Sequence, residues 1–174
     1  MLETYAKMLG YNTAGILSRI TEGRNFQIQL SGLPPSEPPT CELAVSIDFD
    51  GFTDDDECKR VSGRMTCGAI RFADIRPLLT GIAAHLGLEA AILETEAGPQ
   101  NILNEFLNIV IGQTGADWAE HGFEMNFSTP RALSGQALPI VNQEDQAFHV
   151  IVSDLAGIRV DIVLVFSDQS RPVA

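Results

Sequence analysis

The chain has 174 residues, of which 45% are hydrophobic and 20% charged, a composition typical of a globular domain and unlike that of a disordered chain. Its 23 acidic residues outnumber 11 lysines and arginines, and the net charge of −12 disfavours binding to nucleic acid or to an anionic membrane surface. No apolar run approaches the roughly 20 residues needed to span a bilayer, and the first residues do not resemble a signal peptide. We therefore expect a cytoplasmic protein folded as one domain over residues 1–174.

The first half of the chain predicts one helix followed by strands. Apolar residues at helical spacing indicate the helix, and alternating apolar residues indicate the strands. The expected elements are a helix over about 2–22, a strand at 26–30, a proline-rich loop at 32–39, a strand at 41–49, an acidic loop at 48–57 and a strand region at 60–72.

The second half predicts helices and then consecutive strands. Pro77 in the first turns and Gly87 at the end bound a helix at 73–87. A helical continuation at 88–96 and a helix of roughly 22 residues from 100 to about His121 follow. The strand candidates after them are 123–128, 132–141, 147–155 and 157–166. Asp154 and Gly157 bracket a predicted hairpin turn between the last two strands. This order predicts an α+β fold in which a mostly antiparallel sheet is covered on one face by long helices.

The acidic run from Asp48 to Glu57 does not match a calcium-binding loop. An EF-hand counted from Asp48 places Gly51 fourth instead of sixth, and it places Lys59 at the twelfth position, where a glutamate is needed. We interpret the run as a solvated acidic loop between strands.

The cysteines and histidines do not have the spacing of a metal site or a disulfide framework. The cysteines are odd in number and lack a CxxC pair, and the histidines lack an HExxH pair. They are Cys41, Cys58 and Cys67, and His85, His121 and His149. The common nucleotide-binding loops and the GxSxG motif are absent from the sequence as well. We expect no metal or cofactor of the protein's own.

The helix that begins near residue 100 carries a narrow polar stripe. At 100° per residue the stripe is about 100° wide, and the rest of residues 102–111 is apolar. Its members are Asn101, Asn104, Glu105, Asn108, Gly112 and Gly115. The stripe is either the wet side of an amphipathic helix or a site where Glu105 and Asn108, at i and i+3, act together. A carboxylate can hold a cation, and an amide can orient a water molecule without titrating.

The segment EFLNIVIG at 105–112, followed by FSTPRALSG at 127–135, resembles the signature of the CheX/CheC/FliY family. These proteins are chemotaxis phosphatases that dephosphorylate the response regulator CheY, and their motif is Glu-x-x-Asn on a long helix. The resemblance covers residues of about 98–167 well. It is closer to CheX, which has one such motif, than to CheC, which has two.

The resemblance implies a CheC-like fold and a role for each residue of the motif. Asn108 would hold water in line with the aspartyl phosphate of a phosphorylated CheY-type receiver, and Glu105 would pair with the lysine of the receiver's active site. The Mg²⁺ that the reaction needs would belong to the receiver. Asn101, Asn104 and Gly112 would support the site, although the family usually has Ser or Asp where this chain has Asn101.

The resemblance also raises two questions about assembly and site number. The segment GYNTAG at 10–15 is similar to a decayed first motif of the two-site members, but Leu9 stands in place of its glutamate, so we expect one active site. Family members often dimerise by joining sheet edges, and the segment 157–166 is a candidate for such an edge.

Two other functional interpretations also fit the sequence. In one, the protein is a non-catalytic binding module that docks on a receiver or on another signalling protein. In the other, it is an unrelated α+β protein in which Glu105 and Asn108 only face solvent.

Overall fold

The computed structural model describes residues 2–32, 41–53, 60–69, 71–133 and 145–168. The helices are α1 (Leu2–Ile20), α2 (Phe72–His85), the short 3₁₀ helix η1 (Ala90–Glu94) and α3 (Gly98–Glu120). The strands are β1 (Gln27–Gly32), β2 (Leu43–Thr53), β3 (Arg60–Ala69), β4 (Phe123–Phe127), β5 (Arg131–Leu133), β6 (Gln146–Ser153) and β7 (Arg159–Asp168). None of the helices in these described ranges is both long and apolar enough to cross a membrane.

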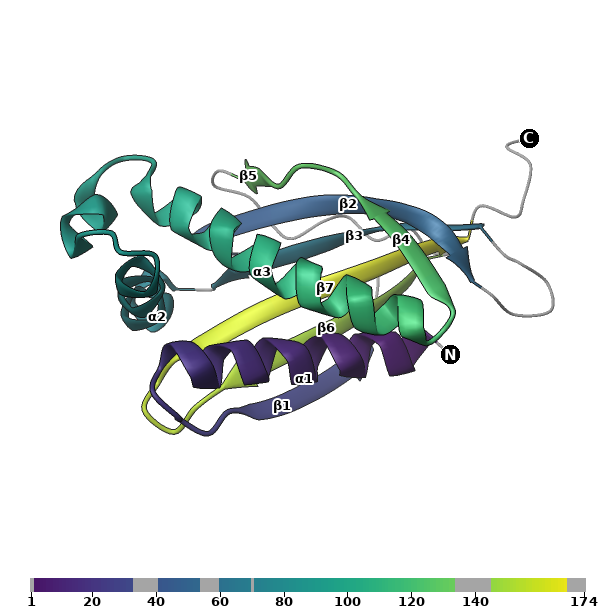
Figure 1. The fold of residues 1–174 in the computed structure, drawn as a ribbon, viewed down its shortest axis with the longest axis horizontal. Coiled ribbons are helices and arrows are strands. Elements are labelled where there is room, and N and C mark those ends of the chain that lie inside the picture. The colour runs from purple at the N-terminus through teal and green to yellow at the C-terminus, as the bar shows by residue number, and fades with distance from the viewer. Residues whose placement is uncertain (1, 33–40, 54–59, 70, 134–144, 169–174) are drawn as a thin grey trace.

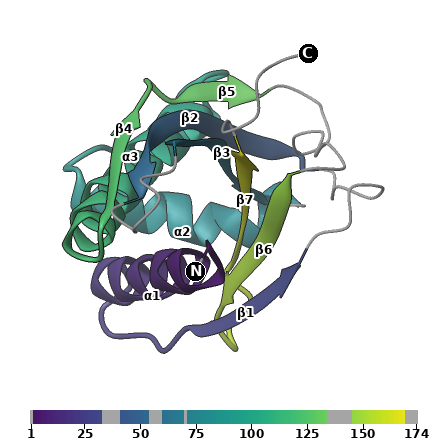
Figure 2. The same ribbon diagram turned by 90° about the vertical axis from the view of Figure 1, so that its right-hand side faces the viewer.

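The seven described strands form one sheet in which every pairing is antiparallel. The strand order is β1-β6-β7-β3-β2-β4, and β5 pairs with β2 further along the same edge as β4. The three α-helices lie on one side of this sheet, and Figure 2 shows that the sheet curves around them. The predicted α+β arrangement, with long helices over one face of an antiparallel sheet, is confirmed.

The main hydrophobic core fills the space between the helices and the concave face of the sheet. In β2 the alternate residues Leu43, Val45, Ile47 and Phe49 are buried in this core, as the sequence predicted. The helix α3 crosses the sheet diagonally in Figure 1 and contributes buried apolar residues such as Ile102, Phe106 and Val110 to the core. Burial of this surface, at roughly 25 cal/mol per Å² of apolar area, is the main force that holds the helix layer to the sheet.

An aromatic cluster closes the core at the C-terminal end of α3. The indole of Trp118 lies within 5.3 Å of the Phe123 ring and 5.9 Å of the Tyr5 ring, measured between ring centroids. The Trp118 Nε1–H donates a hydrogen bond to the Tyr5 carbonyl oxygen at 3.1 Å, and the Tyr5 hydroxyl donates to the His121 carbonyl oxygen at 3.1 Å. These contacts join the start of α1 to the end of α3, so the two helices run antiparallel over the sheet.

The segment 157–166 was a candidate for a sheet edge through which two copies could join, and the structure contradicts that interpretation. It forms most of β7, which lies inside the sheet between β6 and β3 and is hydrogen-bonded on both sides. Its nearly unbroken apolar sequence reflects burial on both faces, a pattern typical of a central strand. The exposed edges of the described sheet are β1 on one side and β4 with β5 on the other. The hairpin turn before β7 forms as predicted, with the Asp154 N–H donating to the Ile158 carbonyl oxygen at 3.0 Å.

The predicted acidic loop at 48–57 is also corrected in its first part. Residues 48–53 continue β2, and burial alternates along them. Phe49 and Gly51 are buried, whereas Asp48 and Asp50 lie on the more exposed side. Asp50 pairs with Arg60 of β3 across the strands, at 3.7 Å. The acidic side chains are therefore cross-strand partners and not a solvated loop. Residues 54–59 lie outside the described part of the chain, as do residues 33–40 of the proline-rich loop.

One predicted element is shorter than the sequence indicated, and another lies mostly outside the described residues. The helical continuation at 88–96 is only the 3₁₀ turn η1, because Gly87 adopts a φ of +71° and ends α2, where the Leu88 N–H donates to the Ala83 carbonyl oxygen. Of the strand expected at 132–141, residues 132 and 133 lie in β5, and residues 134–141 lie outside the described ranges.

The described thiols are buried, with no disulfide bond. Cys41 and Cys67 are less than one-tenth exposed. Burial raises the pKa of the Cys41 thiol to about 11, and it raises the pKa of Cys67 as well. Both thiols are therefore protonated and unreactive at neutral pH.

A buried carboxylate, Asp161 of β7, forms polar contacts on the side of the sheet that faces away from the helices. It is fully buried, it receives two hydrogen bonds from the Arg159 guanidinium at 2.8 and 2.9 Å, and it contacts His149 Nε2 at 2.8 Å. Burial alone would raise the pKa of Asp161, but the hydrogen bonds from His149 and Arg159 outweigh it and lower that pKa below its usual value. The ionised form is therefore the form that the fold stabilises.

Replacing Asp161 with Asn should lower the free energy of unfolding by about 3 kcal/mol at pH 7, because Arg159 loses its buried partner. Urea unfolding at pH 7 measures the change. Since the folded state lowers the Asp161 pKa, the contribution is present above the unfolded value of about 3.9 and is lost as the pH falls through the folded value. The control is Asp50→Asn, which removes an exposed pair and should change stability by less than about 1 kcal/mol. Equal losses in the two variants would contradict the assignment.

Candidate functional site

The polar stripe of α3 is the part of this helix that faces solvent. Asn101, Glu105, Asn108 and Gly112 are exposed at spacings of four, three and four residues, which places them on one side of the helix. The residues between them are mostly buried, including Leu103, Phe106 and Leu107. Figure 1 shows this helix at the surface of the helix layer. The helix is therefore packed in protein except along one strip, as its sequence predicted.

Glu105 and Asn108 are exposed neighbours on this strip, and neither is engaged elsewhere. They are three residues apart, so their side chains project from the same side of consecutive turns. Neither side chain has a hydrogen bond or an ion pair with another residue in the described ranges. The Glu105 carboxylate can therefore receive an outside cation, and the Asn108 amide can both donate to and accept from an outside group.

The other predicted members of the stripe have different surroundings. Gly112 is exposed, and a Cβ atom added to it would meet nothing within 4 Å, so the helix backbone is open to a partner there. Gly115, the other glycine of the stripe, is covered, because a Cβ on it would lie 3.1 Å from the Phe127 ring. Gly115 therefore allows α3 to pack against β4. Asn104 is half-buried, and its Oδ1 is buried with no hydrogen-bond partner among the described residues.

The rear side of α3 is held by a polar network from α1 that the sequence analysis missed. The Asn12 side chain is buried, and its Nδ2 donates to Asp117 Oδ2 at 2.8 Å and lies 3.5 Å from Thr114 Oγ1. Its Oδ1 accepts from Gln113 Nε2 at 3.5 Å, and the Arg19 Nη2 donates to Gln113 Oε1 at 2.8 Å. The sequence signal was a lone Asn on the apolar side of the first helix, which required a buried partner.

The same network accounts for the segment at 10–15 that is similar to a second motif. Leu9, in the place of the motif's glutamate, is fully buried in the core, and Asn12 is turned toward α3. Gly10 lies against the sheet, because a Cβ added there would be 2.8 Å from Ile28 Cγ2. This part of α1 therefore presents no exposed glutamate and asparagine at motif spacing, whereas α3 presents Glu105 and Asn108.

The turn after β4 flanks the stripe on the side of the sheet edge. The Ser128 N–H donates to the Asp48 carbonyl oxygen at 2.9 Å, and Ser128 Oγ accepts from the Asp48 N–H at 3.1 Å. The Asp48 carboxylate binds Arg64 at 2.6 Å and also pairs with Arg131 of β5. The first part of the FSTPRALSG segment thus anchors the edge of the sheet next to α3, and residues 134–135 lie outside the described ranges.

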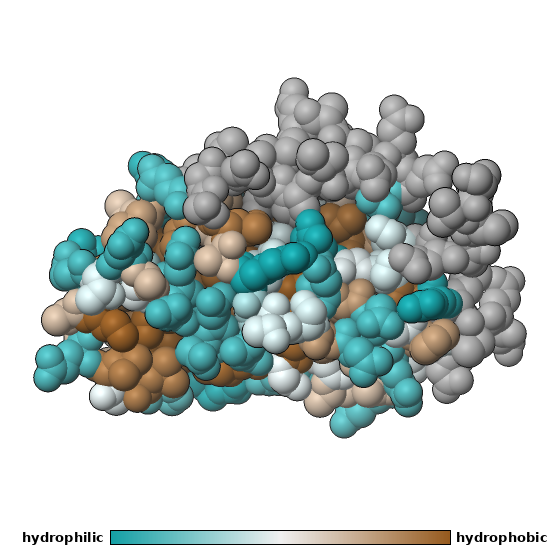
Figure 3. All heavy atoms as spheres, turned by 90° about the horizontal axis from the view of Figure 1, so that it is seen from above, coloured by the Kyte–Doolittle hydropathy of each residue, from teal (hydrophilic) through white to brown (hydrophobic). Residues whose placement is uncertain are grey.

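An apolar area lies at the end of the molecule where α2 meets η1. Leu86 and Leu88 are 38% and 41% exposed there, and Figure 3 shows apolar surface gathered at this end of the face seen from above. The 3₁₀ helix η1 packs against the start of α3, where a Cβ on Gly98 would collide with the Ile92 carbonyl oxygen. Exposed apolar surface of this kind is a common feature of protein-binding surfaces.

Comparison with known proteins gives structural likenesses without sequence matches. No family model and no curated protein matches the chain. The structure is similar to CheX in the Borrelia burgdorferi CheX–CheY–BeF₃–Mg²⁺ complex, with a TM-score of 0.69, 14% identity and coverage of 94% of this chain and 98% of that one. It is also similar to the Vibrio vulnificus chemotaxis protein CheX, with a TM-score of 0.67, 17% identity and coverage of 94% and 99%.

A third similar structure is a CheC-like superfamily protein from Shewanella, with a TM-score of 0.66, 14% identity and coverage of 94% and 97%. The chain has the CheC-like fold. At these identities the likeness establishes the fold, over nearly the whole length of each protein. The CheC-like fold that the resemblance implied is therefore confirmed.

Replacing Asn12 with Ala should lower the free energy of unfolding by about 1–3 kcal/mol, because Asp117 and Gln113 lose a buried partner. Thermal or urea unfolding measures the loss. The control on the same helix is Lys7→Ala, which removes an exposed pair with Glu3 and should change stability by less than about 0.5 kcal/mol. If both variants unfold like the parent, Asn12 does not fasten α1 to α3.

Proposed function

We propose that the protein accelerates hydrolysis of the aspartyl phosphate on a CheY-type receiver protein, using the exposed stripe of α3. The observation that carries the proposal is the pair of unengaged side chains Glu105 and Asn108 on the exposed side of a helix whose other side is buried. The similar fold of a CheX that was solved in complex with CheY supports the choice of partner. A cytoplasmic signalling role follows from this partner.

In the proposed reaction, the Asn108 amide oxygen accepts a hydrogen bond from a water molecule and holds it in line with the phosphorus atom. The water oxygen forms a bond to phosphorus while the bond to the receiver's aspartyl oxygen breaks, giving inorganic phosphate and a free carboxylate. An amide suits this role because it orients water without exchanging a proton. The receiver's Mg²⁺ supplies charge stabilisation to the phosphoryl oxygens when it is bound.

Glu105 has a binding role in this proposal. Its carboxylate pairs with the receiver's lysine one turn before Asn108, and this fixes the register of α3 on the receiver. Because the Glu105 carboxylate has no partner among the described residues, it does not have to leave an existing ion pair first. The open backbone at Gly112 and the apolar area around Leu86 and Leu88 provide further contact surface.

The second candidate function is a non-catalytic module that docks on a receiver through the same stripe. Two observations favour it: Asn101 stands where the family usually has Ser or Asp, and no described residue holds the Asn108 amide in a fixed orientation. A catalytic amide needs an orientation set by its surroundings. In the phosphatase proposal, contacts with the receiver orient the Asn108 amide once the complex forms. In a docking module, the amide stays without a fixed orientation even in the complex.

The Asn108→Ala variant should lose acceleration by roughly 10²-fold or more, the scale for removing one positioned polar group. The measurement is the lifetime of phosphate on a purified receiver with Mg²⁺, with parent protein, with the variant, and alone. The control is Asn126→Ala, which removes an exposed amide from β4 outside the stripe.

A variant that binds and hydrolyses as fast as the parent would overturn the role of Asn108. A parent protein that binds the receiver without shortening the phosphate lifetime would support the docking module instead.

Replacing Gly112 with Ala should stabilise the fold and impair the function. Alanine favours a helix by about 1 kcal/mol over glycine, so Tm should rise by about 2–4 °C, but its methyl group enters the proposed contact surface. The matched control is Gly15→Ala on α1, where an added Cβ also meets nothing within 4 Å. It should stabilise without affecting receiver dephosphorylation. Full activity in the Gly112 variant would show that the partner does not approach there.

A further inference from the structure

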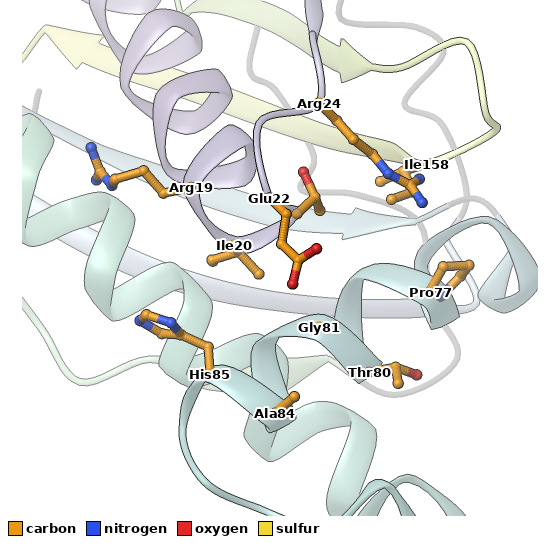
Figure 4. A pocket seen from close by; sticks show the side chains of 11 residues that line it. Arg19, Ile20, Glu22, Arg24, Pro77, Thr80, Gly81, Ala84, His85 and Ile158 are labelled. Atoms are coloured by element: carbon orange, nitrogen blue, oxygen red, sulfur yellow. The ribbon is translucent and has the colours of Figure 1, made fainter.

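A cavity of about 570 Å³ opens between the end of α1, the turn that follows it and α2. Its volume lies within the range of small-molecule sites. The lining residues are Arg19, Ile20, Thr21, Glu22, Arg24, Pro77, Thr80, Gly81, Ala84, His85 and Ile158. None of them belongs to α3, so the cavity is separate from the stripe that carries the proposed phosphatase site. Figure 4 shows the side chains around it.

The two arginines on the wall of the cavity have their charged groups engaged elsewhere. The Arg19 guanidinium donates to Gln113 Oε1 at 2.8 Å, on α3, and the Arg24 guanidinium pairs with Asp154 Oδ2 at 3.2 Å, in the turn before β7. In Figure 4 the guanidinium of Arg19 points away from the middle of the cavity. An anion in the cavity would have to compete with these existing partners.

The Glu22 carboxylate is the charged group without such a partner. It has no hydrogen bond or ion pair with another described residue, and Figure 4 shows it extending from the end of α1 toward α2, into the cavity. The surfaces around it include the half-buried Ile20 and Gly81 and the buried Ile158. Glu22 itself is exposed, and the lining also includes the polar residues Thr80 and His85. An unpaired carboxylate beside the aliphatic groups of Ile20 and Ile158 favours a ligand that joins a positive charge to an aliphatic chain.

The backbone at Glu22 supports a role for its side chain. Glu22 has a φ of +57° and is the one residue other than glycine with a positive φ in the described ranges. It occupies the position after the helix cap in a Schellman motif, in which the Gly23 N–H donates to the Ser18 carbonyl oxygen at 2.8 Å. Glycine is the usual residue there because it adopts this conformation without steric strain. The chain has a carboxylate at a position where its backbone would be more stable as glycine.

We propose that this cavity is a binding site for a small alkylammonium compound, with its ammonium group on Glu22 and its aliphatic chain between α1 and α2. Ile20, Gly81 and Ala84 contact the chain, and the engaged arginines mark the ends of the site. The net charge of −12 draws cations toward the protein and opposes anions.

The test uses cadaverine, a five-carbon diamine, added to the ¹⁵N-labelled protein and followed by NMR. Saturable shifts confined to the amides of Glu22, Gly23, Gly81 and Ala84 are expected. The Glu22→Gln variant, which keeps the size of the side chain and removes its charge, should bind about tenfold more weakly or worse. Glu89→Gln, which removes another exposed carboxylate outside the cavity, should bind like the parent.

Glutarate, a dianion with the same number of carbons, tests the sign of the charge. No glutarate shifts at these amides are expected. Glutarate binding in place of cadaverine would overturn the proposal, as would cadaverine binding that is equal in the parent and in Glu22→Gln. Non-saturating shifts spread over the acidic surface would overturn it too.

The Glu22→Gly variant adds a second readout, the melting temperature, to the measurement of cadaverine binding. Its Tm should rise by about 2–4 °C because glycine removes the backbone strain, and its cadaverine shifts should disappear. A rise in Tm with cadaverine binding retained would show that the carboxylate is not the binding group.

Discussion

The packing of α3 into the concave side of the sheet is the constraint on which the rest of the structure depends. Its buried apolar side is part of the core, Trp118 packs at one end of that core, and Asn12 hydrogen-bonds α1 to α3. These contacts fix the rotation of α3 about its own axis, because any other rotation would bury the polar stripe. The exposure of Glu105 and Asn108 is therefore a consequence of core packing and does not need contacts of its own.

This arrangement explains how a protein with unengaged site residues can present them in a fixed place. The backbone of α3 is held by its buried side, while the side chains of Glu105 and Asn108 have no partner among the described residues. The binding partner then has to order only a few side-chain torsions, and the entropy lost on binding is small for two side chains. The polar network of Gln113 and Asp117 with Asn12 lies behind the stripe, so α1 acts as a support for α3.

Much of this could be predicted from the sequence, because α3 and β2 have strong periodic patterns. The stripe, the buried face of β2 and the end of α2 at Gly87 follow from local rules of helix and strand periodicity and capping. The position of β7 could not be predicted in this way. An apolar run fits an edge strand that joins a second copy as well as it fits a central strand, and only the long-range pairing of β7 with β3 and β6 separates the two.

The same limit applied to residues whose role depends on a distant partner. Asp48 was interpreted as part of a solvated loop because its partners, Arg64 and Arg131, are 16 and 83 residues away. Gly115 was assigned to the open polar stripe because the Phe127 ring that covers it belongs to another element. The candidate pair itself, by contrast, lies three residues apart on one helix, so its geometry was readable without tertiary information.

The central claim is that the Asn108 amide enters the phosphate pocket of a receiver, and the most direct measurement is the NMR signal of its side-chain NH₂ group. The ¹⁵N-labelled protein would be mixed with an unlabelled CheY-type receiver carrying Mg²⁺ and beryllofluoride, which mimics the aspartyl phosphate. The account predicts a large shift of the Asn108 side-chain signal with the beryllofluoride form and little or none with the receiver lacking it. An unchanged Asn108 signal in a complex whose contacts lie on other elements would contradict the account.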